Sequence, residues 1–163
     1  MLAKILSKSD CAACKFCCSF RRQSLWETPV FNKEDKEIIL KKYPDIKFRQ
    51  TGNSYTIDLY SSYKTDNPDE EALCPFLKDN SGCILPSELK PFDCSIWPFR
   101  IVKKDKLWLC LTPTCSAINK IPLEAVTNFA KTELKQKVID YVQKNPQIIK
   151  EDSDFFVPLF PLE

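Results

Sequence analysis

The stretch DCAACKFCCSFRRQ, residues 10–23, places four cysteines within eight positions: Cys11, Cys14, Cys17 and Cys18. The chain carries five more cysteines, Cys74, Cys83, Cys94, Cys110 and Cys115. Inert buried cysteines are usually scattered singly through strands and helices. That interpretation fits Cys110, which lies in the apolar run 107–111, but it does not fit the crowded N-terminal group. The fold is therefore expected to depend on what these sulfur atoms bind.

The bulk composition is that of a small globular protein. With 163 residues, 44% of them hydrophobic, the chain is long enough for one domain. A net charge of only +2 gives no sign of a nucleic-acid partner. The first residues contain no signal-peptide core, and no apolar run is long enough to span a membrane. We expect a cytoplasmic protein, whose thiols stay reduced.

Two absences from the sequence narrow the chemistry. There is no histidine, which excludes Ser-His-Asp and Cys-His catalysis and every imidazole metal ligand. The only two glycines, Gly52 and Gly82, lie far apart, so neither a P-loop nor a GxGxxG fingerprint is present.

The predicted fold class is α+β: a small single domain, residues 1–163, with short hairpins, an irregular cysteine-rich metal-bound core and a long C-terminal helix. Residues 33–42 form a helix capped by Asn32, and residues 122–144 form the long helix. Hairpins are expected at 46–60 and 99–111. Residues 152–163 are apolar and twice broken by proline, which predicts an extended tail packed over the core.

Metal binding is the interpretation that uses nearly all of the thiols. A disulfide framework needs an oxidising compartment, and a thioredoxin-like Cys-x-x-Cys site leaves most of the cysteines unused. Thiolates are soft ligands that suit zinc and iron–sulfur clusters. The local sequence places several of them next to rigid or sharply turned backbone, as in Cys74-Pro75 and the predicted turn 79–82 before Cys83.

Basic residues flank both groups of cysteines. They are Lys15, Arg21, Arg22, Lys78, Lys90 and Arg100. Thiolates that share a site repel one another, so nearby cations would help to hold them together. The alternative is that these residues are ordinary solvated side chains.

The cysteine pattern resembles the zinc- or iron-chelating domain family of CxxCxxCC, YkgJ-like cysteine-cluster proteins. The matching parts are Cys11-x2-Cys14-x2-Cys17-Cys18, Cys74-Pro-Phe-Leu, Cys83-Ile-Leu, Lys90-Pro91, Cys94, Trp97-Pro-Phe and Cys115-Ser-Ala-Ile. The resemblance covers residues 11–118 and leaves Cys110 as an extra cysteine. It implies metal chelation by eight residues: Cys11, Cys14, Cys17, Cys18, Cys74, Cys83, Cys94 and Cys115. Lys90 and Ser95 stand where the family usually has arginine.

The identity of the metal stays open between an iron–sulfur cluster, slightly favoured, and zinc. The spacing Cys11-x2-Cys14-x2-Cys17 is the opening of a ferredoxin-type run, and Cys74-Pro75 would supply its fourth ligand. A structural zinc site without histidine needs four cysteines or a carboxylate. The adjacent Cys17 and Cys18 are expected to point in different directions and not to share one zinc ion easily.

Three functions are compatible with these residues. The first is a metal-binding protein with a structural or electron-transfer role that acts with another protein. The second is a protein-modifying enzyme, by analogy with flagellin lysine methylase, which carries the same cluster. The third is a zinc-stabilised interaction module. No catalytic residue is identified, and the carboxylates of Asp58, Asp79 and Asp93 are expected at the surface or in turns.

Overall fold

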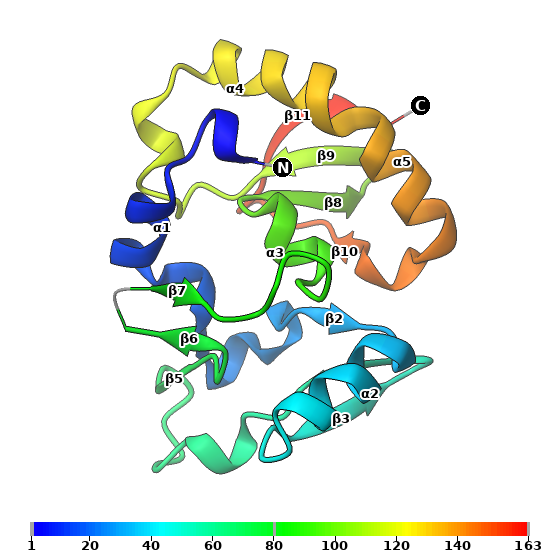
Figure 1. Ribbon diagram of the computed structural model, residues 1–163. Coiled ribbons are helices and arrows are strands. Elements are labelled where there is room, and N and C mark those ends of the chain that lie inside the picture. The colour runs from blue at the N-terminus through cyan, green and yellow to red at the C-terminus, as the bar shows by residue number, and fades with distance from the viewer. Residues whose placement is uncertain (1, 80, 163) are drawn as a thin grey trace. The chain divides into compact units, whose positions relative to one another are not determined.

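The structure is a computed structural model that describes residues 2–79 and 81–162 (Figure 1). It contains both helices and sheets, so the predicted α+β class is confirmed. Contacts within the chain divide it into two units. We call Lys15–Cys94 the cysteine unit, and Met1–Cys14 with Ser95–Glu163 the sheet unit. That the chain folds as one domain stays a prediction.

Small antiparallel sheets and one regular helix build the cysteine unit. Strand β1 (Ser19–Arg21) pairs with β5 (Glu71–Leu73), and β6 (Leu77–Lys78) pairs with β7 (Gly82–Cys83). A third sheet has the order β2 (Val30–Phe31), β4 (Ser54–Ile57), β3 (Phe48–Thr51). Short 3-10 helices lie between them: η2 (Phe16–Cys18), η3 (Arg22–Glu27) and η4 (Tyr60–Ser62).

Helix α2 (Lys33–Lys42) forms where the sequence predicts it. The Asn32 side chain accepts a hydrogen bond from the Asp35 backbone N–H at 2.7 Å, which satisfies one of the N–H groups that a helix start leaves unpaired. Burial of the Asp35 carboxyl raises its pKa, while the Asn32 hydrogen bond lowers it. The helix turns Ile39 into the core of the unit.

The hairpin β3–β4 also matches its prediction. Gly52 in its turn has φ +57°, a left-handed conformation that glycine adopts without steric cost. The hairpin delivers Phe48 and Ile57 to the core, where the Phe48 ring meets the Phe31 ring edge-on at 5.2 Å. Phe76 packs against the same cluster.

A four-stranded sheet is the centre of the sheet unit, in the order β10-β8-β9-β11. Strands β8 (Phe99–Lys103) and β9 (Leu107–Leu111) form the second predicted hairpin. The short β10 (Lys150–Glu151) runs parallel to β8. The remaining helices of the unit before the long helix are η1 (Leu2–Lys4), α1 (Lys8–Cys14) and η5 (Ile118–Lys120).

The C-terminal tail is more ordered than the sequence predicts. Its residues Val157–Pro161 form strand β11, which pairs antiparallel with β9 at the edge of the sheet. An edge strand tolerates Pro158 and Pro161 because one side of its backbone needs no ladder partner. The predicted extended tail therefore includes an edge strand that contains two prolines.

Helical residues run without interruption from Leu123 to Lys144. Helix α4 (Leu123–Phe129) continues through a π-helical stretch, η6 (Ala130–Leu134), into α5 (Lys135–Lys144), and η7 (Pro146–Ile148) follows. Figure 1 shows α4 and α5 running past the sheet, and the Phe129 ring stacks on Phe99 of β8 at 6.5 Å. Apolar residues at helical spacing along this segment are buried at Val126, Ala130, Leu134, Val138 and Val142, whereas Leu123 is exposed.

Helix α3 (Phe92–Ile96) lies where the chain passes from the cysteine unit into the sheet unit. Among the described residues, no helix combines the length and the apolar character that crossing a membrane requires.

Two neighbouring isoleucines of α2 give a test of the core. The Ile39 side chain is 0% exposed and that of Ile38 is 48% exposed. Ile39→Ala should lower the free energy of unfolding by about 2–5 kcal/mol, because it leaves a cavity among packed side chains. Ile38→Ala changes helix propensity equally and should cost no more than about 0.5 kcal/mol. Urea unfolding followed by circular dichroism measures both, and equal losses would contradict the packing described for α2.

Candidate metal centre

Five of the nine cysteines line one small cavity in the cysteine unit: Cys17, Cys18, Cys74, Cys83 and Cys94. The cavity has a volume of about 40 Å³, room for roughly three water-sized objects. Its remaining walls are apolar side chains together with Lys90; the apolar residues are Phe20, Pro29, Phe31, Ile57, Phe76, Leu85 and Pro91. Sulfur donors from four separate segments thus face one largely apolar space.

The pairing of β1 with β5 brings the first two segments together. Ser19 lies opposite Leu73 in the antiparallel register. Just outside this pair, one residue before β1 and one residue after β5, the Cys74 backbone N–H donates a hydrogen bond to the Cys18 carbonyl at 2.7 Å. Cys17 and Cys18 lie in the 3-10 turn before β1, and their Sγ atoms are 4.0 Å apart. The expectation that these adjacent side chains point in different directions is therefore wrong.

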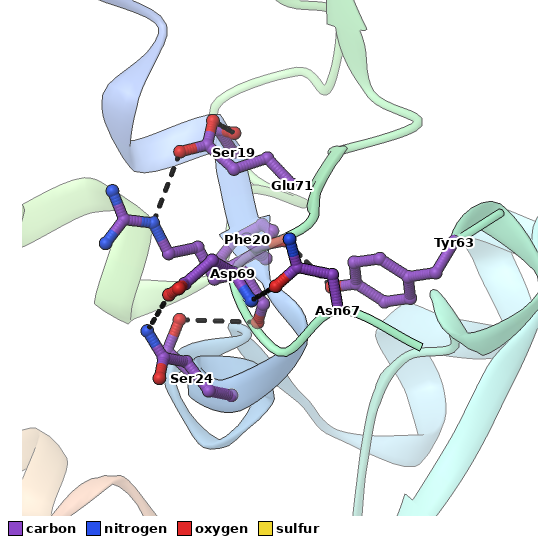
Figure 2. A network of polar contacts seen from close by, with 9 residues as sticks. Ser19, Phe20, Ser24, Tyr63, Asn67, Asp69 and Glu71 are labelled. Carbon is purple, nitrogen blue, oxygen red and sulfur yellow. Dashed lines mark hydrogen bonds and ion pairs between the residues drawn. The ribbon is translucent and has the colours of Figure 1, made fainter. Parts of the chain in front are cut away.

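A network of polar contacts holds β1 against β5 (Figure 2). The Ser19 hydroxyl donates to the Glu71 carboxylate at 2.7 Å, and this bond, followed by the Arg21 contact, lowers the Glu71 pKa. The buried Tyr63 hydroxyl donates to the Phe20 carbonyl at 2.8 Å. The Gln23 amide donates to Asp69 at 2.7 Å. These bonds fix the backbone that carries Cys17 and Cys18.

The hairpin β6–β7 brings Cys83 to the same cavity. Its register sets Cys83 opposite Leu77, three residues after Cys74. The Ile84 N–H donates to the Phe76 carbonyl at 2.8 Å and extends the pairing. Gly82 has φ +74°, in the left-handed region. The turn predicted at 79–82 thus does precede Cys83, although Asn80 lies outside the described residues.

Cys94 comes to the cavity from the short helix α3. The preceding residue, Asp93, is buried, and its carboxylate accepts a hydrogen bond from the Val30 backbone N–H at 3.3 Å. The expectation that Asp93 lies at the surface is wrong: its side chain is buried, and its hydrogen bond links the start of α3 to β2. This role was missed because the partner is a backbone group far away in the sequence.

The electrostatics of the cavity are clearest at Cys74. The pKa of its thiol is raised to about 12, mainly by burial and to a smaller extent by the nearby Cys83 and Cys17. The backbone N–H groups of Phe76 and Leu77 lie near the sulfur and act in the opposite direction, and the Leu77 N–H also donates to the Cys74 carbonyl at 2.9 Å. Hydrogen bonds to a sulfur stabilise its charged form. The backbone after Cys74 is therefore already arranged to support a thiolate, while the lack of solvent disfavours one unless a cation is bound.

The other cysteines lie in the sheet unit. Cys11 and Cys14 lie one turn apart on α1 and are exposed, whereas Cys115 is buried. The Ser116 hydroxyl is 4.0 Å from the Cys14 sulfur, so the segment at Cys115 comes close to α1. Cys110 is fully buried in β9, and burial raises its pKa to about 11.

No metal-ready cluster is preformed in residues 2–79 and 81–162: no three cysteine, aspartate or glutamate side chains lie closely enough together to hold an ion. The cavity thiols would need to turn toward one point to hold an ion. As a donor set, five thiols around a small apolar cavity suit a soft or borderline metal ion. The residues that line the cavity therefore fit a metal centre in their chemistry.

Most of the basic residues predicted to flank the cysteines are engaged elsewhere. Lys15 pairs with Asp79 at 2.5 Å, Arg21 pairs with Glu71 at 3.3 Å, and the Arg22 guanidinium lies over the Tyr63 ring at 4.6 Å. Arg100 of the sheet unit lies over the Trp97 ring at 4.4 Å. Lys90, in contrast, lines the cavity itself.

Comparison of the chain with models of protein families, with curated proteins and with solved structures gave no match. The resemblance to the cysteine-cluster family therefore stands on the cysteine spacing and stays a prediction.

The burial of the thiols predicts their reactivity. In reduced, metal-free protein, iodoacetamide should modify the exposed Cys11 and Cys14 first. Cys110 should react roughly 100-fold more slowly than an ordinary thiol, because a pKa of about 11 leaves so little thiolate at neutral pH. Timed alkylation with peptide mapping by mass spectrometry measures each rate. All nine rates should converge in urea, and rapid modification of Cys110 in the folded protein would contradict its place in β9.

Proposed function

We propose that this protein binds a metal ion through the cysteine thiolates of the cysteine unit and that the bound metal has a structural role. The observation that carries the proposal is the convergence of Cys17, Cys18, Cys74, Cys83 and Cys94 on one small, largely apolar cavity. Thiols gathered in this way bring little packing advantage over ordinary apolar side chains, whereas they form a complete ligand set for a soft ion.

The distance between Cys17 and Cys18 favours a single ion such as zinc. With Zn–S bonds of about 2.3 Å, two sulfurs on a tetrahedral zinc lie about 3.8 Å apart. The 4.0 Å between the Cys17 and Cys18 sulfurs is close to this value, so both can ligate one ion. Three thiols then remain in the cavity for the other two positions. An iron–sulfur cluster, which the spacing of the N-terminal cysteines favours, is the alternative outcome of the test.

A structural role follows from the small size of the elements around the cavity. Strands β1 and β5 have three residues each, and β6 and β7 have two each. Isolated two-stranded ribbons are at best marginally stable in water. A structural thiolate metal site contributes about 10–16 kcal/mol, more than the marginal stability of such ribbons. The metal would hold together segments that the strands alone hold weakly.

The partner that we propose is another protein, in the reducing environment of the cytoplasm. Three exposed apolar side chains, Phe16, Leu73 and Ile84, are each the chain neighbour of a cysteine that lines the cavity. Exposed apolar side chains gathered near one site are typical of protein contact surfaces. Free thiols would persist as ligands only where disulfides do not form.

The direct test is metal analysis of protein purified without oxygen. We expect colourless protein with zinc bound in stoichiometric amount. The Cys18→Ser/Cys74→Ser/Cys83→Ser variant should lose the ion held in the cysteine unit, and Cys110→Ser should keep it. The matched Cys11→Ser/Cys14→Ser variant reports on any ion held in the sheet unit.

Two results would overturn parts of the proposal. A broad absorption band near 400 nm with bound iron would replace zinc by an iron–sulfur cluster. Unchanged metal content in the triple-serine variant would exclude the cavity as the binding site.

The two glycine turns offer a second test of the same site. Gly82 and Gly52 both have positive φ, so alanine at either position should cost about 1–2 kcal/mol of stability. Only Gly82 leads into a cysteine of the cavity. Gly82→Ala should therefore weaken zinc binding in a chelator competition, whereas Gly52→Ala should leave the affinity unchanged. Equal effects on affinity would show that the β6–β7 turn does not position Cys83 for binding.

A further inference from the structure

Lys90 is the one charged residue in the lining of the cavity, within the part of the chain that the structure describes. Its side chain is half-buried, and both of its chain neighbours, Leu89 and Pro91, are buried. The Leu89 N–H donates to the Pro86 carbonyl at 3.1 Å, which fixes the turn that precedes Lys90. The backbone at Lys90 is thus anchored on both sides, and the root of its side chain is held beside the thiols.

We propose that Lys90 is a positioning residue of the metal centre, whose ammonium group supplies compensating positive charge to the thiolates. The inference rests on the proposed function, since it concerns the same cavity. It goes further by assigning to one residue the role that the sequence distributes over six basic side chains. Lys90 acts through the thiolates and is not itself a ligand.

The need for a cation follows from the charges. A divalent ion with four thiolates carries a net charge of −2, and with three thiolates a net charge of −1. Burying such a charge among apolar side chains is costly, because the medium around it screens poorly. An ammonium group in the cavity wall offsets part of this charge and can donate hydrogen bonds to sulfur.

The other basic residues near the cysteines of this unit have different contacts. Lys15 and Arg21 form ion pairs with Asp79 and Glu71, and the Arg22 guanidinium donates to the Thr65 carbonyl. Lys78 of β6 is exposed and is absent from the cavity lining. Lys90 is therefore the basic residue that shares the lining of the cavity with the thiols.

The expected effect is that of a residue that supports ligands without binding the metal. Such residues typically change metal affinity by about 10- to 100-fold. Lys90→Met keeps the length and apolar stem of the side chain but removes its charge. Lys90→Arg keeps the charge, and Lys78→Met removes an exposed charge on the neighbouring hairpin.

The experiment titrates the full-length, reduced, metal-free protein with Co²⁺ and Zn²⁺. Co²⁺ gives a visible spectrum that reports thiolate ligation, and competition with a chromophoric chelator gives the Zn²⁺ affinity. Lys90→Met should bind the same number of ions with 10- to 100-fold lower affinity. Lys90→Arg and Lys78→Met should stay within about threefold of the original protein. The loss in Lys90→Met should persist at high salt, because ions screen a partly buried charge poorly.

The outcomes separate this inference from the proposed function. If the original protein and Lys90→Met bind Zn²⁺ equally well, the role of Lys90 is refuted and the metal centre stands. If Lys78→Met loses as much affinity as Lys90→Met, the effect is one of net charge and the inference also fails. If the original protein binds neither ion, the proposed function itself fails. Should Lys90→Met not fold, Lys90→Gln is titrated in its place with the same criteria.

Discussion

The hydrogen bond from the Cys74 N–H to the Cys18 carbonyl is the contact on which the cysteine unit depends. It continues the β1–β5 ladder by one residue and brings together two segments that are far apart in the sequence. Closing so long a loop costs conformational entropy. The pairing of two three-residue strands offsets only a small part of that cost. The polar contacts of Ser19, Tyr63 and Gln23 strengthen the ladder, and the cavity thiols lie just beyond its end. Metal ligation at that position would stabilise the pairing by adding strong bonds across the same two segments.

The sequence is informative where structure is determined locally. Helix α2 has its N-cap at Asn32, acidic residues in its first turn and basic residues in its last turn. Each of these signals lies within one turn of a helix end and is therefore readable from the local sequence. The β3–β4 hairpin follows from alternation around a glycine turn. The β1–β5 pair has no such signature, because three residues show no periodicity and the partner strand is chosen by long-range contacts. The tail 152–163 is predicted only as an extended segment for a related reason: prolines weaken a strand prediction, yet they are acceptable at the edge that β11 occupies.

The candidate site was likewise predictable from the sequence only in its local features. Spacing alone singled out the cysteines as ligands, but it gave no basis for assigning them to one site or another. The cavity selects Cys17, Cys18, Cys74, Cys83 and Cys94, whereas Cys11, Cys14 and Cys115 belong to the sheet unit. Side-chain direction at adjacent residues also cannot be derived from spacing: the 3-10 turn at Phe16–Cys18 brings the sulfurs of Cys17 and Cys18 within 4.0 Å. Asp93 was misassigned because carboxylates are rarely buried, and its backbone partner on β2 is visible only in three dimensions.

Two features of the cavity affect the protonation of the Cys74 thiol in opposite directions. Burial keeps the thiol protonated, while the Phe76 and Leu77 N–H groups favour its thiolate. In a site that never binds a cation, the Phe76 N–H would face a neutral sulfur, which is a weak acceptor, whereas the Leu77 N–H also has the Cys74 carbonyl as its acceptor. A bound metal ion reconciles the two features, because its charge stabilises the thiolate in a place from which water is largely excluded. The apolar walls then become an advantage, since they limit access of water and of competing ligands to the centre. The same exclusion of water would make any uncompensated negative charge costly, which is the physical basis for proposing a role for Lys90, the basic residue of the cavity lining.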